Sequence, residues 1–343
     1  MLKKHIHTLD FLRGLSALGV VALHFTLTSF FVKDSNSLTT AFAYGKYGVH
    51  VFFVISGFII PFSMMKSEYQ LGHYLSYLKR RFTRVCLPSY VSILITFLLY
   101  YAVIILLGRP INNFNWPGIN LSAVLGNLTY TVSYLKTSWY NPVYWTLAIE
   151  FQFYILIGLI YPLIKRKNNL QIISLFCFCL ILGAYLPLES FFTYSGFFVL
   201  GICLFLKRAK IMPLYLNVFL FIVASLFCFF QHGYVALIFS LVTFFLIFSE
   251  LDINTKVTNY LGKISFSIYI THCVVEIFSE VFINRFIDVE LSTFNRMILL
   301  VAHLTVTIAF ATIFYKYIEE PFALYSKKMK FLKRNKAKTI PKL

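Results

Sequence analysis

Apolar residues form long, nearly uninterrupted runs along this chain, separated by short polar segments. Runs of about 17–25 residues match the length of a helix that crosses a bilayer. They are continuous rather than alternating with a period of two, which excludes a membrane-spanning β-barrel. The pattern predicts an all-α polytopic membrane protein of about ten transmembrane helices. The expected spans are residues 9–31, 46–65, 83–107, 145–164, 170–187, 191–206, 213–231, 234–249, 265–284 and 297–318.

One further apolar segment is too short and polar to cross. Residues 121–135 (LSAVLGNLTYTVSYL) are expected to form an interfacial or re-entrant piece. If they spanned, the cluster Lys165-Arg166-Lys167 would face outward, against the preference of basic loops for the cytoplasm. Ten spans instead place most of the 31 Lys and Arg residues inside, with both termini cytoplasmic. We expect one transmembrane domain over residues 1–326 and a basic cytoplasmic tail over 327–343.

Composition agrees with a membrane protein. Hydrophobic residues make up 59% of the chain and charged residues 13%, against about 25% charged in soluble domains. The net charge of +18 follows from topology and from attraction to anionic membrane lipids, so no nucleic-acid partner is expected. The cysteines lie in or beside apolar runs and show neither a disulfide framework nor zinc-ligand spacing, so no metal is expected. They are Cys86, Cys177, Cys179, Cys203, Cys228 and Cys273.

The first expected span carries three ionisable side chains. Asp10 and Arg13 lie three residues apart on one helical face, where their charges partly offset each other. His24 comes eleven residues after Arg13, about 16 Å further along a helix. Ionisable groups inside a bilayer are costly and usually face a protein interior or a water-filled cavity. His24 is therefore a candidate functional group, and the alternative is a histidine that only bonds a neighbouring helix.

The second expected span contains small residues and another histidine. Gly48, Ser56 and Gly57 stand where helices can approach closely, so helix packing is their expected role. His50 begins this span on the outer side, at a depth comparable with that of His24. It either lines an outward-facing cavity or is simply solvated.

Basic residues precede the third expected span. Arg80, Arg81 and Arg84 lie in KRRFTRVCLP, partly as the positive-inside rule requires. Arg81 and Arg84 share one helical face, and paired guanidinium groups suit phosphate binding. Pro88 is expected to kink the helix and to free backbone carbonyls. The segment predicts an anion site, with topology alone as the alternative.

The fourth expected span combines an aromatic entry with a buried acid. Trp145 belongs to the outer interface, and Glu150 lies five residues further in, ahead of Tyr154. Glu150 is thus about 8 Å deep, close to the expected depth of His24. A carboxylate beside an imidazole can orient a general base. Otherwise Glu150 is a structural partner of another polar group.

Two later motifs add polar groups. SFSIYITH contains Tyr269 and His272, and the expected start of the ninth span places His272 in the inner half, well below the first-span histidine. Glu319, Glu320 and Pro321 close the last span on the cytoplasmic side. The two carboxylates can pair with the arginines there.

Together these motifs resemble the acyltransferase family 3 of integral membrane acyltransferases. The matching strings follow the family order over nearly the whole chain: LDFLRG with His24, GKYGVHVFFVISGF, KRRFTRVCLP, WTLAIEFQFY, SFSIYITH and EEP. The resemblance implies transfer of an acyl group, usually acetyl from acetyl-CoA, to sugars of surface polysaccharides such as lipopolysaccharide O-antigen or to small molecules. It also implies that His24 is the essential histidine, Arg13 its companion, Arg81 with Arg84 the basic motif, and Glu150 the acidic position.

Residues and resemblance together predict an O-acetyltransferase of a bacterial inner membrane. Acetyl-CoA enters from the cytoplasm, and a carbohydrate acceptor, either free or lipid-linked, enters from outside. Direct transfer and an acyl-histidine intermediate both stay open. The expected catalytic residues are His24 and Glu150. The donor is expected to contact Arg13, Arg80, Arg81, Arg84 and His272, and the acceptor to contact His50, Trp145 and Tyr154. Structural roles are expected for Asp10, Gly48, Ser56, Gly57, Tyr269, Glu320 and Pro321.

Other functions are compatible with some of these residues. Buried His and Glu also make proton relays, which allows a proton-coupled exporter, but no paired broken helices in corresponding halves support it. A catalytically silent sensor would not explain phosphate-type arginines together with a deep histidine. The acceptor is alternatively a small molecule or a lipid. Aromatic and amide groups expected outside favour a carbohydrate: Asn112, Asn113, Asn115, Trp116, Asn120, Trp139 and Tyr140.

Overall fold

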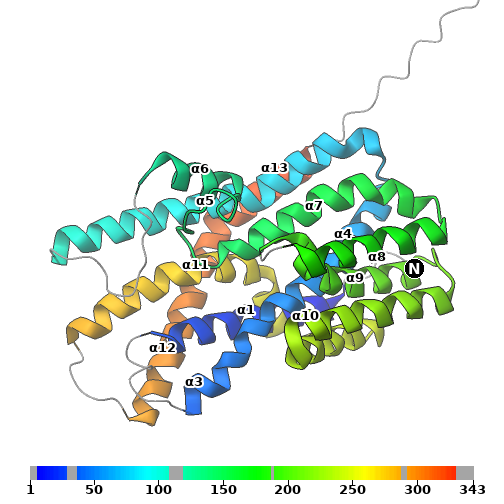
Figure 1. The fold of residues 1–343 in the computed structure, drawn as a ribbon. Coiled ribbons are helices and arrows are strands. Elements are labelled where there is room, and N and C mark those ends of the chain that lie inside the picture. Colours follow the sequence, from blue (N-terminus) through cyan, green and yellow to red (C-terminus); the bar gives the residue numbers. More distant parts are fainter. Residues whose placement is uncertain (1–5, 29–36, 108–118, 187–188, 287–291, 330–343) are drawn as a thin grey trace, which may run out of the picture.

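The computed structural model describes residues 6–28, 37–107, 119–186, 189–286 and 292–329, and every regular element in these ranges is a helix (Figure 1). This confirms the all-α prediction. The elements are α1 (His7–Thr26), α3 (Ser37–Phe42), η1 (Ala43–Tyr47), α4 (Gly48–Lys66), η2 (Leu71–His73), α5 (Tyr74–Leu107), α6 (Leu121–Thr129), α7 (Tyr144–Lys165), α8 (Asn169–Tyr185), α9 (Phe191–Arg208), α10 (Leu214–Phe248), α11 (Lys256–Phe286), α12 (Thr293–Phe314), η3 (Tyr315–Glu319) and α13 (Glu320–Lys328).

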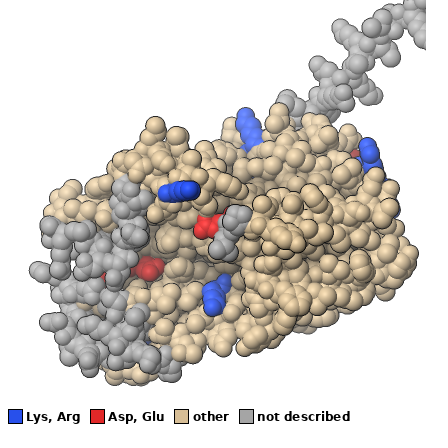
Figure 2. All heavy atoms as spheres, viewed as in Figure 1, with Lys and Arg blue, Asp and Glu red and all other residues tan. Residues whose placement is uncertain are grey.

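Eight of the described helices are long and apolar enough to cross a membrane. The face drawn in Figure 2 carries few charged side chains among its described residues, as expected for helices that contact lipid. α8 is apolar and has 17 residues, at the lower end of the length that crosses a bilayer. The chain is therefore a polytopic helical membrane protein, while the number of crossings and the side of each terminus stay predictions.

Helix α10 is two helices joined at Gly233. Gly233 has φ 81° and ψ 171°, a conformation that only glycine adopts at no steric cost. The Phe221 and Phe244 rings lie 4.7 Å apart, whereas 23 residues of straight helix would separate them by about 34 Å. α10 therefore folds back on itself, and its turn lies where the hydropathy pattern separates two expected spans.

The short segment after α5 does not span. α6 has nine residues and is followed by turns. The buried Asn127 side chain bonds Ala123 O, Ser138 O and Tyr140 N at 2.9, 3.1 and 2.9 Å. These bonds hold Ser138 and Tyr140 against α6. The interfacial or re-entrant position expected for residues 121–135 stays a prediction.

Glycines bring the central helices into close contact. A Cβ on Gly262 of α11 would lie 2.4 Å from Asp10 Cα of α1, and one on Gly14 would lie 2.8 Å from Leu261 Cβ. A Cβ on Gly57 of α4 would lie 2.1 Å from Phe198 O of α9. Small residues at these points let helix backbones touch. The expected packing role of Gly57 agrees with this contact, and Asp10 contributes to the α1–α11 contact.

The end of the described chain bends through a π-helical turn. η3 separates α12 from α13, and Pro321 lies in the first turn of α13. The extra residue of a π turn changes which side chains face inward. Glu319 is buried as a result, while Glu320 is half-buried. Beyond this turn α13 lies along α5 (Figure 1).

Candidate active site

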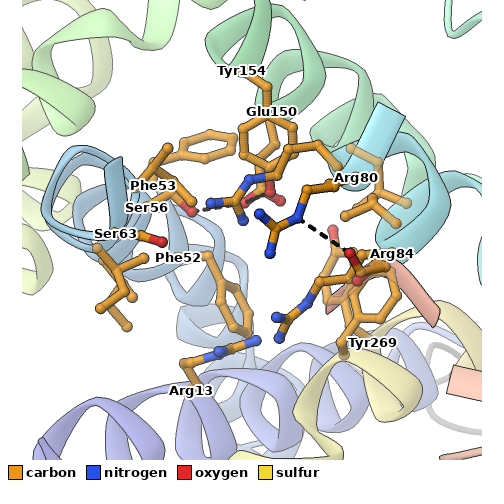
Figure 3. A pocket seen from close by; sticks show the side chains of 18 of the residues that line it. Arg13, Phe52, Phe53, Ser56, Ser63, Arg80, Arg84, Glu150, Tyr154 and Tyr269 are labelled. Carbon is orange, nitrogen blue, oxygen red and sulfur yellow. Dashed lines mark hydrogen bonds between the residues drawn. The ribbon is translucent and has the colours of Figure 1, made fainter. Parts of the chain in front are cut away.

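A cavity of about 320 Å³ lies between α1, α4, α5, α7, α11 and α13. Four arginines line it, and Figure 3 shows Arg13, Arg80 and Arg84 reaching into the same space from two helices. The fourth, Arg81, comes from α5 as well. The donor-site arginines expected from the sequence are therefore gathered in one cavity.

The α5 arginines differ in their surroundings. Arg81 is held between two aromatic rings, with its guanidinium carbon 5.6 Å from the Tyr77 ring centroid and 5.2 Å from that of Tyr154. Arg84 lies deep in the protein yet keeps an exposed side chain, because its surface opens into the cavity. The cavity thus presents guanidinium groups that a bound anion can reach.

Glu150 belongs to this cavity (Figure 3). Its Oε1 accepts hydrogen bonds from Ser56 Oγ at 2.7 Å and from the Tyr154 hydroxyl at 2.6 Å. Ser56 therefore has a polar partner as well as the packing role expected of it. Tyr154, expected at the acceptor site, lines the arginine cavity instead and links Glu150 to Arg81.

Glu319 supplies the second carboxylate. It accepts a bond from Ser267 Oγ at 2.6 Å and lies close enough to Arg13 and Arg84 to interact with their charges. Glu320 faces away and pairs with Lys263 at 3.7 Å and with the Tyr315 hydroxyl at 3.1 Å. Of the two expected acids, only Glu319 meets the arginines, because the π turn orients them differently.

His24 lies against His272, with ring centroids 5.1 Å apart. This corrects the prediction that His272 sits well below His24. Its expected donor-binding role stays a prediction, and it is not among the residues that line the arginine cavity. α11 begins at Lys256, nine residues before the expected span. The helices run side by side from the Gly14–Gly262 contact, and each histidine comes ten residues after its glycine. Equal rise along both helices brings the two rings to one level.

The His272 ring has a defined hydrogen bond. Its Nδ1 donates to Tyr269 O at 2.8 Å, which leaves Nε2 as an acceptor in the neutral ring. Cys273 Sγ lies 3.5 Å from that Nε2. The potential ligand atoms of His24, His272 and Cys273 all lie within 4.8 Å of one another. Two imidazoles and a thiol are a donor set that zinc accepts, although the sequence predicts no metal.

Tyr269 separates the cavity from the histidine pair. It lines the cavity, its ring lies 6.0 Å from the His272 ring, and its hydroxyl bonds Thr146 Oγ1 at 2.6 Å. His24 itself is half-buried and is not among the cavity-lining residues. Arginines and histidines thus form two adjacent polar sites, with an aromatic residue between them.

The predicted pairing of Glu150 with His24 is not formed. Among the described residues, Glu150 is bonded by Ser56 and Tyr154, whereas the ring partner of His24 is His272. Both side chains are half-buried in the protein. The rotation of α7, which turns Glu150 toward α4, cannot be obtained from depth.

Two residues expected to bind the acceptor lie elsewhere. The His50 ring packs 4.4 Å from Phe197 and 5.7 Å from His232, so it faces α9 and α10 rather than a cavity shared with His24. The Trp145 ring lies 5.4 Å from Tyr194. Both form part of an aromatic cluster, because the N-terminal ends of α4 and α7 pack against α9 there.

Several of the polar groups expected outside are also structural. Asn120 caps α6 by accepting from Ala123 N at 2.7 Å, and Tyr140 is only 2% exposed. Trp139 is half-buried. Asn112, Asn113, Asn115 and Trp116 lie outside the described residues.

Three contributors to the sites were not singled out by sequence. Tyr77 packs on Arg81, Ser267 bonds Glu319, and Lys327 lines the cavity. Tyr77 lies four residues before Arg81, a spacing at which helical side chains meet. Lys327 was expected to belong to the tail. No local pattern distinguishes it from the lysines around it.

The model of an acyltransferase domain matches residues 6–316. The chain belongs to acyltransferase family 3. The arginine cavity and the histidine pair therefore lie in a membrane acyltransferase.

A relative of this family 3 acyltransferase is Acyltransferase MdmB of Streptomyces mycarofaciens. It is 28% identical over 162 residues, which cover 45% of this chain and 39% of that protein. The match thus spans less than half the length of either. No solved structure matches the chain.

Proposed function

We propose that this acyltransferase moves an acetyl group from acetyl-CoA to a hydroxyl group of a carbohydrate on the outer side of a bacterial inner membrane. The observation that carries the proposal is the convergence of Arg13, Arg80, Arg81 and Arg84 on one cavity. Guanidinium groups bind phosphate oxygens through paired, charge-assisted bonds. A thioester donor with a pyrophosphate matches such a cavity better than an uncharged donor does.

The distance between the cavity and the histidines supports a CoA thioester as the donor. Arg13 lines the cavity, and His24 lies eleven residues further along the same helix, about 16 Å away. An extended pantetheine arm can span this length once its phosphates are held by the arginines. The arm has to pass Tyr269, which lies between the cavity and the histidine pair.

His24 then acts as general base in the proposed reaction. It takes the proton of the acceptor hydroxyl while that oxygen attacks the thioester carbonyl, so that a carbon–oxygen bond forms. The carbon–sulfur bond breaks as the tetrahedral intermediate collapses, and protonated His24 returns the proton to the thiolate. Such proton transfer contributes about 10²–10⁴-fold to a rate.

His272 takes the orienting role that the sequence suggests for Glu150. Its Nε2 accepts, since its Nδ1 is committed to Tyr269 O. A hydrogen bond from one His24 nitrogen to this atom, direct or through one water, would leave the other His24 nitrogen as the base. A base held by a third group is the usual arrangement in acyl transfer.

The acceptor proposal rests on family resemblance more than on geometry. Sugars stack on aromatic rings and bond to amides, but the described outer residues of that kind serve the fold. Family membership favours transfer over proton-coupled export. A small molecule or a lipid is the alternative acceptor.

Acetyl-CoA turnover by the purified protein tests the donor. The protein in nanodiscs should release CoA thiol from acetyl-CoA in the presence of membrane glycolipid extract, and a His24→Gln variant should not. Mass spectrometry of surface glycans from cells with and without the protein tests the acceptor. Unchanged glycan acetylation with continued thiol release would redirect the acceptor to a small molecule or a lipid.

A further inference from the structure

Helix α13 closes one end of the arginine cavity. Two of its residues, Ser326 and Lys327, line the cavity together with Arg80 of α5. By the predicted topology this is the cytoplasmic end, from which a soluble donor arrives. The sequence placed Lys327 in a tail that only attracts membrane lipids, but the helix continues through Lys328.

Specific contacts hold α13 at this place. Arg80 Nε donates to Ser326 O at 3.2 Å, drawn as a dashed line in Figure 3. Thr83 Oγ1 lies 4.0 Å from Met329 Sδ, within reach of a weak bond. The Ser326 side chain is buried. The next residue, Lys327, is therefore positioned by the helix.

Among the described residues, the side chains that line the cavity carry more positive than negative charge. Five cationic side chains line it, together with two carboxylates, Glu150 and Glu319. Both carboxylates already accept hydrogen bonds, from Ser56 and Tyr154 and from Ser267. Among the described residues, Lys327 is exposed and pairs with no acid. A ligand with more than one anionic group is needed to match this excess.

We propose that Lys327 and Arg80 form a phosphate subsite for the nucleotide end of the donor, occupied by a phosphate monoester. This inference rests on the proposed function, in which the donor is a CoA thioester. The deeper arginines then hold the pyrophosphate, and Lys327 binds the 3′-phosphate. A phosphate monoester carries about −1.5 to −2 charges at neutral pH, which makes it the strongest available partner for a lysine at the mouth of the cavity. The site thereby distinguishes CoA thioesters from donors that lack this phosphate.

The neighbouring lysine provides a matched control. Lys328 has the same charge and lies on the same helix, but it is not among the cavity-lining residues. KM and kcat are measured for wild type, Lys327→Ala and Lys328→Ala with acetyl-CoA and with acetyl-3′-dephospho-CoA. Lys327→Ala should raise the KM for acetyl-CoA at least fivefold, leave the KM for the dephospho donor within twofold, and spare kcat. Lys328→Ala should match wild type with both donors.

The outcomes separate the inference from its premise. Equal KM values for the two lysine variants, or an equal rise with both donors in Lys327→Ala, would overturn the phosphate subsite while acetyl-CoA turnover still stands. Absence of turnover with acetyl-CoA in wild type would overturn the proposed function, and this inference with it. The assay is repeated in nanodiscs with and without anionic lipid. An effect of Lys327→Ala that appears only with anionic lipid would assign the lysine to a lipid headgroup instead.

Discussion

The imidazole rings of His24 and His272 lie 5.1 Å apart at an interplanar angle of 60°. His272 is fully buried, and its Nδ1 is committed to a backbone carbonyl. The pair replaces the expected pairing of His24 with a carboxylate. A neutral ring as neighbour avoids placing an uncompensated negative charge in a membrane interior, which would be costly.

Replacement of His24 by glutamine should abolish transfer. Glutamine keeps hydrogen bonding but takes no proton at neutral pH, so kcat should fall at least 100-fold, while acetyl-CoA binding and melting temperature stay near wild type. His303→Gln is the control, because His303 stacks on Phe25 at 4.0 Å and bonds Ser279 at 3.0 Å. It should lower the melting temperature more than the rate. Near-normal acetylation by His24→Gln would end its role as base.

His272 should act on kcat and not on donor KM. His272→Ala should lower kcat at least tenfold and change the shape of the pH–rate profile, because the tautomer of His24 is no longer set. His272→Gln should recover part of the rate, since its amide can also accept from His24. Cys273→Ser, at the adjacent position, should keep the wild-type profile. An identical loss in all three variants, accompanied by a lower melting temperature, would reduce His272 to a packing role.

Arg84 should govern donor affinity. Loss of a charge-assisted bond to phosphate costs about 1.5–3 kcal/mol, so Arg84→Ala should raise the KM for acetyl-CoA at least tenfold without loss of protein abundance. Arg208→Ala is the control, because Arg208 lies outside the cavity and pairs with the exposed Glu250 at 3.3 Å. The KM for acetyl-CoA is measured with detergent-purified protein. Donor affinity that survives Arg84→Ala would remove this arginine from the site.

Glu150 should influence the donor cavity more than the chemical step. Glutamine retains an oxygen that Ser56 and Tyr154 can bond, so Glu150→Gln should keep kcat within tenfold of wild type. Its effect should appear in the KM for acetyl-CoA, because one of the two cavity carboxylates is lost. Steady-state kinetics with varied acetyl-CoA separates these effects. A fall in kcat as large as that of His24→Gln would instead restore the catalytic role expected from the sequence.

The α4–α9 contact should tolerate no side chain at Gly57. A Cβ there would lie 2.1 Å from Phe198 O, which is backbone and cannot swing away. Overpacking of this kind costs about 1–3 kcal/mol or more, so Gly57→Ala should lower the melting temperature in detergent. Gly72→Ala is the matched control, because nothing lies within 4 Å of its added Cβ. Equal melting temperatures for the two variants would contradict the close contact.

Hydropathy alone determined the class of this protein and most of its helices. Transfer of a helical segment into lipid depends on the residues of that segment, so continuous apolar runs can be interpreted one at a time. The break at Gly233 and the short segment at residues 121–135 were visible for the same reason. Three-residue spacing likewise placed Arg81 and Arg84 on one face, and both line the cavity.

Which residues meet across helices was decided only by tertiary structure. The partner of His24 depends on the register between α1 and α11, and that register is set by the contact of Gly14 and Gly262, about 250 residues apart in the chain. The direction of Glu150 depends on the rotation of α7, and the place of Lys327 on the docking of α13 against Arg80. Depth along a helix is a local property. The rotation of a helix and its register with its neighbours depend on packing between residues that are far apart in the chain. The sequence of one span does not determine them.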